Sequence, residues 1–139
     1  MAPHFSVIIV NWNTRQMTAE CIASVYEMNR QTAFEIIVVD NASSDGSIPW
    51  LQQQFPQVRF ICNTTNTGFA RANNQAIEVA QGELLLLLNS DTILKTSETL
   101  LRLGRYFNEC PDTAVIGAKL LFLDGRVQSV GREFLTLKK

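Results

Sequence analysis

A run of five leucines, residues 84–88, is the feature that most constrains the fold of this 139-residue chain. Five consecutive apolar residues fit a strand that is buried on both faces of a sheet, and they are too few to cross a bilayer. The polar residues Asn89, Ser90 and Asp91 follow the run directly. In an open α/β sheet, ligands bind at the carboxyl ends of the strands. We therefore expect a central buried strand that delivers a ligand-binding carboxylate, although a polar turn that caps the next helix explains the same residues.

Short apolar runs alternate with helical patterns along the rest of the chain. Strands are expected at residues 5–10, 34–39, 58–62, 84–88 and 114–118. Helices are expected after Thr14, around Pro49, and over residues 69–80 and 97–110, with Thr14 as an N-cap and Gly82 as a terminating glycine. This alternation predicts βαβ units, and Asp124-Gly125 predicts a hairpin between residues 120–123 and 126–130. The expected fold class is therefore α/β, a three-layer and mostly parallel sheet flanked by helices, with a C-terminal β-hairpin.

The composition is that of one ordinary globular domain. Hydrophobic residues make up 46% of the chain and charged residues 18%, which excludes a disordered or fibrous protein. A net charge of −1 gives no reason to expect nucleic-acid binding. The three widely spaced cysteines predict neither disulfides nor a zinc site, and the first residues lack a signal-peptide pattern. We expect a cytoplasmic chain with no transmembrane segment.

Three of the loops should meet at one edge of the sheet, after the first, second and fourth strands. Trp12 in the first loop could stack on a heterocycle, or it could cover the rim of the core. Asp40 in the second loop could accept hydrogen bonds from a pyrimidine N–H or a ribose hydroxyl. A turn carboxylate bonded to nearby amides is the alternative, but an isolated Asp after a buried strand favours a function.

Gly68 opens a further helix, whose free amides and dipole would face an anion. Arg71 in its first turn opposes that dipole, which suggests that it serves a negative ligand, although a surface arginine is the alternative. The chain has no G-x-G-x-x-G and no Walker loop, so dinucleotide oxidoreductases and P-loop proteins are disfavoured. His4 is the single histidine and precedes the first strand, which gives little support to a Ser-His or Cys-His nucleophile.

Four blocks resemble, in order and spacing, the successive motifs of the family 2 glycosyltransferases. They are residues 7–13 (VIIVNWN), 38–47 (VVDNASSDGS), 66–73 (NTGFARAN) and 88–91 (LNSD). Each block alone is weak, but four in register are specific and span essentially the whole chain. A closing block, with residues 117–121, Asp124-Gly125, Gln128 and 131–134, is similar to the rhamnosyltransferase-like branch. The resemblance implies a GT-A fold and inverting transfer of a sugar from a nucleoside diphosphate.

The resemblance also implies roles for individual residues. Val10, Asn11, Trp12 and Asp40 would hold the nucleobase and ribose, and Arg71 would lie beside the base or the diphosphate. Asn89 and Ser90 would belong to the diphosphate hinge. Asp91 matches the final acid of the D-x-D-type motif and would bind Mg²⁺ or Mn²⁺. Asn89 stands where the motif has its first Asp, so the diphosphate should supply most of the metal ligands.

The catalytic base of such an enzyme is a carboxylate that comes well after the metal motif. The chain holds no convincing match to that segment, and Glu133 is its last carboxylate. We therefore expect residues 1–139 to be one nucleotide-sugar-binding domain of a longer transferase, with the base beyond Lys139. The donor would be a UDP- or dTDP-linked sugar, and the branch likeness favours rhamnose. The acceptor would be a saccharide or lipid-linked molecule of the cell envelope, reached in the cytoplasm or at the inner face of the membrane.

Three other functions compete with this one. A non-catalytic nucleotide-binding or regulatory module of the same fold would share every motif except the base. A nucleotidyltransferase would need a glycine-rich loop and a lysine after Val10, which the chain lacks. A receiver-like signalling domain would need an acidic pair after the first strand, which is absent as well.

Overall fold

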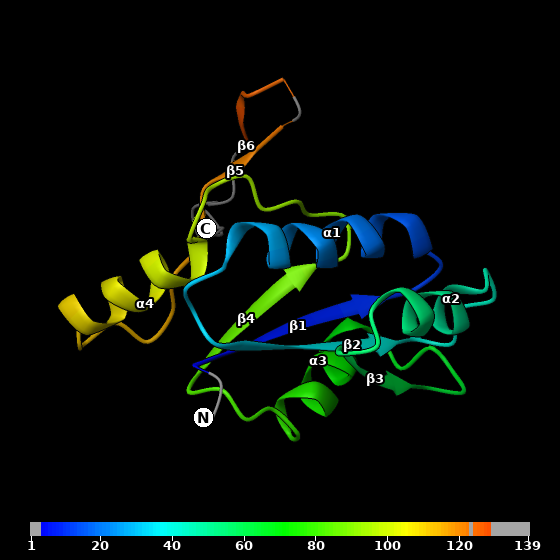
Figure 1. Cartoon of the computed structure of the whole chain (residues 1–139). Helices are drawn as coiled ribbons and strands as arrows, with labels where there is room; N and C mark the ends of the chain where they lie inside the picture. Colours follow the sequence, from blue (N-terminus) through cyan, green and yellow to red (C-terminus); the bar gives the residue numbers. More distant parts are fainter. Residues whose placement is uncertain (1–3, 123, 129–139) are drawn as a thin grey trace, which may run out of the picture.

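The computed structural model describes residues 4–122 and 124–128 (Figure 1). Its parallel strands are β1 (Phe5–Asn11), β2 (Phe34–Asp40), β3 (Arg59–Cys62) and β4 (Leu84–Asn89), in the spatial order β3-β2-β1-β4. The helices are α1 (Arg15–Met28), α2 (Ser47–Gln54), α3 (Phe69–Ile77) and α4 (Thr99–Glu109). A second, antiparallel sheet pairs β5 (Leu120–Leu121) with β6 (Val127–Gln128). Each parallel strand except β4 is followed by a helix that returns the chain to the next strand, as the alternation of patterns predicts.

Helices cover the main sheet on both faces, with α1 on one side and α3 on the other (Figure 1). The first face packs against α1, α2 and α4, through a core that includes Val7, Ile9, Ile22, Leu51 and Leu100. The second face packs against α3, whose small residues Ala72 and Ala76 meet Ile8, Ile37 and Val39. Since β1 and β2 are apolar on both faces and lie between the two helix layers, they are the buried centre of the sheet. The three-layer α/β class expected from the sequence is confirmed.

The leucine strand is at the edge of the sheet, and the prediction that it is central and buried on both faces is wrong. β4 pairs with β1 on one side, and no further strand of the described residues pairs with its other side. Leu84, Leu86 and Leu88 pack against the first core, whereas Leu85 and Leu87 are 44% and 52% exposed. The cause is the position of α3, which packs against β1 and β2, so that Leu85 and Leu87 on the second face of β4 stay exposed within the described part of the chain. A continuous apolar run therefore does not by itself reveal whether both faces of a strand are covered.

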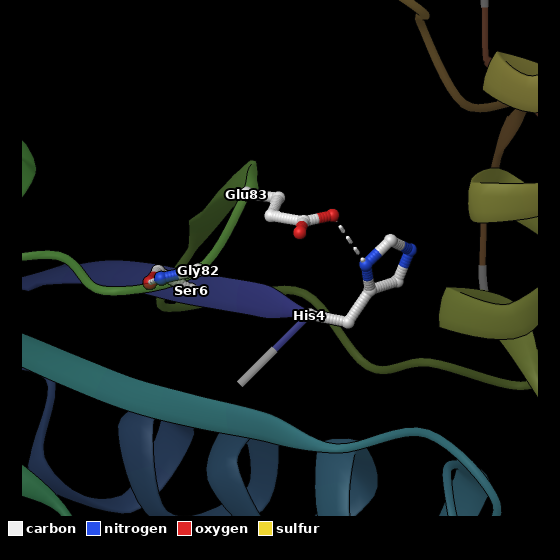
Figure 2. A network of polar contacts seen from close by, with 4 residues as sticks. All are labelled: His4, Ser6, Gly82 and Glu83. Carbon is white, nitrogen blue, oxygen red and sulfur yellow. Dashed lines mark hydrogen bonds and ion pairs between the residues drawn. The ribbon is translucent and has the colours of Figure 1, made fainter. Parts of the chain in front are cut away.

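Two of the expected end signals have other roles. α3 ends at Ile77 with Glu78 as its C-cap, so Gly82 does not terminate the helix. Gly82 instead lies against the backbone of β1, where a Cβ would be 2.4 Å from the Ser6 nitrogen, and its amide donates to Ser6 Oγ at 2.8 Å (Figure 2). Thr14 occupies the N-cap position of α1, but its hydroxyl makes no capping bond because it donates to Asn11 Oδ1 at the end of β1.

The C-terminal part of the chain agrees with the sequence only in part. Residues 114–118 form no strand, contrary to expectation. The hairpin is present: the Phe122 amide donates to the Arg126 carbonyl at 2.8 Å, and Gly125 takes a positive φ of 85° in the turn. Leu123 and residues 129–139, which include Glu133 and the 131–134 block, lie outside the described residues. Within the described part of the chain, every helix is too short or too polar to traverse a bilayer.

Candidate functional site

The polar ends of β1, β2 and β4 lie side by side at the carboxyl edge of the sheet. Asn11 at the end of β1 is in register with Asp40 of β2, and Val10 is in register with Asn89 of β4. The three strands run in parallel and end together (Figure 1). The structure therefore brings the three loops predicted from the sequence to one edge.

Asp40 is held at the end of β2 by two hydrogen bonds. Its Oδ1 accepts from Asn11 Nδ2 at 2.6 Å, and its Oδ2 accepts from the Ser43 amide at 2.9 Å. The side chain is nearly buried, with 3% exposed. An ionised carboxylate has about four acceptor positions, so two of them remain after these bonds. Asp40 thus stabilises its own turn, and it retains acceptor positions for an N–H or hydroxyl group of a ligand.

Asn11 lies at the centre of the polar network, and its side chain is fully buried. Its Nδ2 donates to Asp40 and to Ser43 Oγ, at 2.6 and 3.1 Å. Its Oδ1 accepts from Thr14 Oγ1 and Thr18 Oγ1, at 2.9 and 2.7 Å. The two donors and two lone pairs of the amide are therefore all used. The side chain of Asn11 points into the protein, so any contact with a ligand would be made by its backbone.

The turn after β1 presents Trp12 to solvent. Trp12 is 56% exposed and belongs to neither core, so its ring is available for stacking and does not cover the core. Asn13, with a positive φ of 54°, fixes the turn: its amide donates to Ser43 Oγ at 2.9 Å, and its Oδ1 accepts from the Ser44 amide at 2.8 Å. Val10 packs its side chain against the second core, so its predicted role would also rest on backbone atoms.

The turn after β4 is short and carries an exposed carboxylate. The Thr92 amide donates to the Asn89 carbonyl at 3.1 Å, which closes the turn around Ser90 and Asp91. Asn89 and Asp91 are exposed, and Ser90 Oγ lies 3.1 Å from Thr14 Oγ1. Beneath the turn, Cys21 Sγ donates to the Asn89 carbonyl at 3.5 Å. Burial, followed by the negative charge of Asp91, raises the pKa of Cys21 to about 12, so this thiol stays neutral below the turn.

A third set of polar side chains attaches the start of α3 to the end of β2. Asn41 Nδ2 donates to the Gly68 carbonyl at 3.3 Å, and Asn41 Oδ1 accepts from Asn63 Nδ2 and Thr67 Oγ1 at 3.0 and 3.1 Å. These bonds carry the first turn of α3 to the same edge of the sheet. Arg71 in that turn is exposed, and the ion pairs of the described residues do not include it.

The sequence did not predict the residues whose hydrogen bonds support this edge of the sheet, although it predicted the exposed ones. The sequence predicted Thr14 only as a cap and gave Ser43 and Thr18 no role. A signal was present, because Thr14 and Thr18 are four residues apart and their hydroxyls lie on one face of α1. That face meets the end of β1, where Asn11 needs partners.

The carboxylates at this edge suit a cation that is shared with a ligand. In residues 4–122 and 124–128, no three His, Cys, Asp or Glu side chains are grouped so as to hold a metal ion. Asp91 is the carboxylate at the end of β4, and it is exposed. Mg²⁺ is usually bound by one or two carboxylates together with substrate phosphates, and it keeps some of its waters. A lone exposed carboxylate does not form an all-protein cage, and it fits a metal ion only where a ligand and water would supply the other oxygen atoms.

Comparison with known proteins identifies the family. The family model described as glycosyl transferase family 2 matches residues 6–135. The chain belongs to this family. The match covers all four blocks that suggested the resemblance, and it includes β1–β4 and the polar edge.

The curated relatives of this chain extend well beyond the part that it matches. A poly(ribitol-phosphate) beta-glucosyltransferase of Bacillus spizizenii is 33% identical over 126 residues, which cover 87% of this chain and 20% of the relative. The glycosyltransferase GlyG of Streptococcus pneumoniae is 31% identical over 123 residues, which cover 78% of this chain and 40% of GlyG. The chain thus spans less than half the length of these relatives.

Solved structures of other proteins share the fold. S. aureus TarS, residues 1–349, superposes with a TM-score of 0.66 at 28% identity, over 76% of this chain and 32% of TarS. The same protein has been solved in complex with UDP-GlcNAc, with a TM-score of 0.65. A mannosyltransferase of Pyrobaculum calidifontis has a TM-score of 0.67 at 24% identity, over 77% of this chain and 33% of that one, which supports the GT-A-like fold alone.

Proposed function

We propose that this chain is the donor-binding part of an inverting family 2 glycosyltransferase. The substrate would be a nucleoside diphosphate sugar, and the sugar would pass to a hydroxyl group of an acceptor. The observation that carries the proposal is the meeting of two carboxylates at one edge, Asp40 on β2 and Asp91 directly after β4, on strands that both pair with β1. Asp40 is buried and bonded, whereas Asp91 is exposed, so the two suit different halves of one ligand.

The half of the site around Asp40 would hold the nucleoside. The exposed ring of Trp12 offers a face on which a base can stack, a contact that contributes about 1–3 kcal/mol per base in proteins that bind single strands. The remaining acceptor positions of Asp40 would receive a base N–H or a ribose hydroxyl. The backbone of Val10 and Asn11 would line the same pocket, because the Asn11 side chain is occupied.

The half of the site around Asp91 would hold the diphosphate. Asn89, Ser90 and Asp91 would surround a Mg²⁺ or Mn²⁺ ion, which when bound stabilises negative charge on the departing diphosphate. Arg71 would supply a positive charge from the first turn of α3. Asn89 contributes a neutral oxygen where a second carboxylate would strengthen the metal site, so we expect metal affinity to depend on the diphosphate.

We further propose that residues 1–139 are one donor-binding domain, and that the catalytic base lies in a segment beyond Lys139. The matched part of this chain covers only 20% and 40% of the two relatives. No strand of the described residues pairs with the outer edge of β4, and this edge, with the exposed Leu85 and Leu87, also supplies a surface on which a further segment would pack. A non-catalytic nucleotide-binding module is the alternative. Sugar transfer by the longer protein would exclude it, and turnover by residues 1–139 alone would contradict the placement of the base.

The donor would be a dTDP- or UDP-linked sugar, and the acceptor would be a molecule of the cell envelope. The rhamnosyltransferase-like closing block favours dTDP-rhamnose, whereas the likeness to TarS, solved with UDP-GlcNAc, favours a UDP-linked donor. The relative named for poly(ribitol-phosphate) supports a cell-envelope polymer or its lipid-linked precursor as the acceptor. Such an acceptor would place the full-length protein in the cytoplasm or at the inner face of the cell membrane.

Calorimetry with UDP and dTDP, each with and without Mn²⁺, tests the proposed function. We expect one nucleotide to bind, and to bind more tightly with Mn²⁺. Asp91→Ala should abolish that metal dependence. Asp112→Ala is the matched control, since this exposed carboxylate lies after α4 and should leave binding unchanged. If neither nucleotide binds in the presence of Mn²⁺, the proposed donor site is wrong.

A further inference from the structure

We propose that Asn11 is a positioning residue that couples the nucleoside half of the site to the metal–diphosphate half. This inference rests on the proposed function for the identity of the ligand, but the coupling itself is a property of the protein. Asn11 is fully buried and touches neither half of a ligand with its side chain. Its effect would therefore pass through the groups to which it is bonded.

On one side, Asn11 fixes the carboxylate of Asp40. The 2.6 Å bond from Asn11 Nδ2 to Asp40 Oδ1 involves a charged acceptor and is nearly out of contact with water. The same amide nitrogen donates to Ser43 Oγ, and the Ser43 amide donates to the second oxygen of Asp40. Asn11 thus closes a ring of hydrogen bonds that fixes the orientation of the Asp40 carboxylate.

On the other side, Asn11 is connected to the turn after β4. Its Oδ1 binds the Thr14 hydroxyl at 2.9 Å, and Thr14 Oγ1 lies 3.1 Å from Ser90 Oγ. Ser90 precedes Asp91, the proposed metal ligand. A continuous series of side chains, Asp40, Asn11, Thr14 and Ser90, therefore joins the ends of β2 and β4 across the end of β1.

Asn11→Asp is the sharpest change, because it preserves shape and removes both N–H donors. It also places a second carboxylate against Asp40, which will repel it. Asn29→Asp is the matched control: Asn29 is also a buried amide, it donates to the Val25 carbonyl at 2.9 Å and accepts from the Leu100 amide at 2.8 Å, and it lies at the opposite end of α1. Thr14→Val is a second variant, which removes the hydroxyl between Asn11 and Ser90 and leaves the bond to Asp40 intact.

Hydrogen exchange measured by mass spectrometry tests the coupling without any ligand. Asn11→Asp should speed exchange by 10-fold or more at residues 41–46 and also at 89–93. Thr14→Val should speed exchange at 89–93 alone, and Asn29→Asp should change neither segment. If Asn11→Asp leaves exchange at 89–93 unchanged, the coupling is refuted, whether or not the protein binds a nucleotide. Should Asn11→Asp fail to fold, unchanged exchange at 89–93 in Thr14→Val refutes it equally.

Binding of two separate probes then tests what the coupling does. We expect Asn11→Asp to lower the affinity for uridine by about 10-fold or more, which is the effect of losing one hydrogen bond to a charged group. The affinity for Mn²⁺ with inorganic diphosphate should fall as well. Thr14→Val should weaken only the diphosphate probe. The proposal would be overturned if Asn11→Asp lowered the affinity for uridine alone, or if Asn29→Asp lowered both affinities equally. If the wild-type protein binds neither uridine, nor thymidine, nor Mn²⁺ with diphosphate, the proposed function is refuted, and the exchange result still decides the role of Asn11.

Discussion

Gly82 lies against Ser6 so closely that a Cβ at residue 82 would be 2.4 Å from the Ser6 backbone nitrogen and 2.5 Å from the Phe5 carbonyl carbon. The contact is at the amino end of β4, beside the hydrogen-bonded side chains of His4 and Glu83 (Figure 2). We expect Gly82→Ala to reduce the free energy of unfolding by about 2–3 kcal/mol, because the obstacle is backbone that belongs to the centre of the sheet. Urea unfolding followed by circular dichroism measures this change.

Gly117→Ala is the control for this substitution. No atom lies within 4 Å of the position that its Cβ would take, and its φ is not in the positive region. The expected change in the free energy of unfolding is within about 0.5 kcal/mol. Equal losses in the two variants would show that the contact between Gly82 and Ser6 is not the cause.

The free face of β4 should promote association of the isolated chain. Leu85 and Leu87 are exposed on an edge strand whose outer backbone groups are not paired within the described residues. Exposed apolar edge strands are sites of association. We expect Leu85→Thr/Leu87→Thr to lower the weight-average mass seen in sedimentation equilibrium, because threonine keeps the β propensity and removes the apolar surface.

Leu86→Thr tests the same strand on its other face. Leu86 packs against the first core, so this change should cost about 2–4 kcal/mol of unfolding free energy, whereas the double variant on the free face should cost much less. A chain that is monomeric both before and after the double substitution would contradict the role given to Leu85 and Leu87.

The sequence was sufficient to predict the four parallel strands and the edge at which they meet, but it wrongly predicted a strand at residues 114–118 and did not reveal which strands are neighbours. Residues 84–88 are a strand as expected, because the run of leucines and its polar end are local features. Its position at the edge depends on where α3 packs, which is a tertiary property that the run does not encode. The same holds for Gly82, whose role is set by Ser6, 76 residues earlier in the chain.

The candidate site divides in the same way. Asp40, Trp12 and Asp91 were predicted because each is a polar or aromatic residue directly after an apolar strand. The hydrogen bonds of Asn11 could not be predicted, because its four partners come from residues 14, 18, 40 and 43 and are determined by how α1 meets the sheet. The family resemblance named the residues that we propose as ligand contacts, and it included Asn11 among them without revealing that this side chain is turned inward.

Asp45 should make the stability of the chain depend on pH. Burial acts to raise the pKa of this carboxyl, but hydrogen bonds from Ser47 and from the Arg15 amide outweigh burial and lower the pKa below its usual value. The Ser47 amide donates to Asp45 Oδ1 at 3.0 Å and the Arg15 amide to Oδ2 at 3.1 Å, so Asp45 joins the starts of α1 and α2. Replacing such a helix-start acceptor by alanine costs about 1 kcal/mol, which is the loss expected for Asp45→Ala at neutral pH.

The direction of the pH effect follows from the lowered pKa. Folding favours the ionised form of the Asp45 carboxyl. Its contribution to stability is therefore complete above the pKa of about 3.9 that it has in the unfolded chain, and it is lost as the pH falls through the lower pKa of the folded chain. The free energy of unfolding of Asp45→Ala should therefore equal that of the wild type in acid and be lower than it near neutral pH. Asp45→Asn, which can still accept the amide bonds, should lose less stability and should not show this pH dependence. Urea titrations of the three proteins across this range measure the difference, and a gap between Asp45→Ala and the wild type that stays constant down to the lowest pH would contradict a role for the charge.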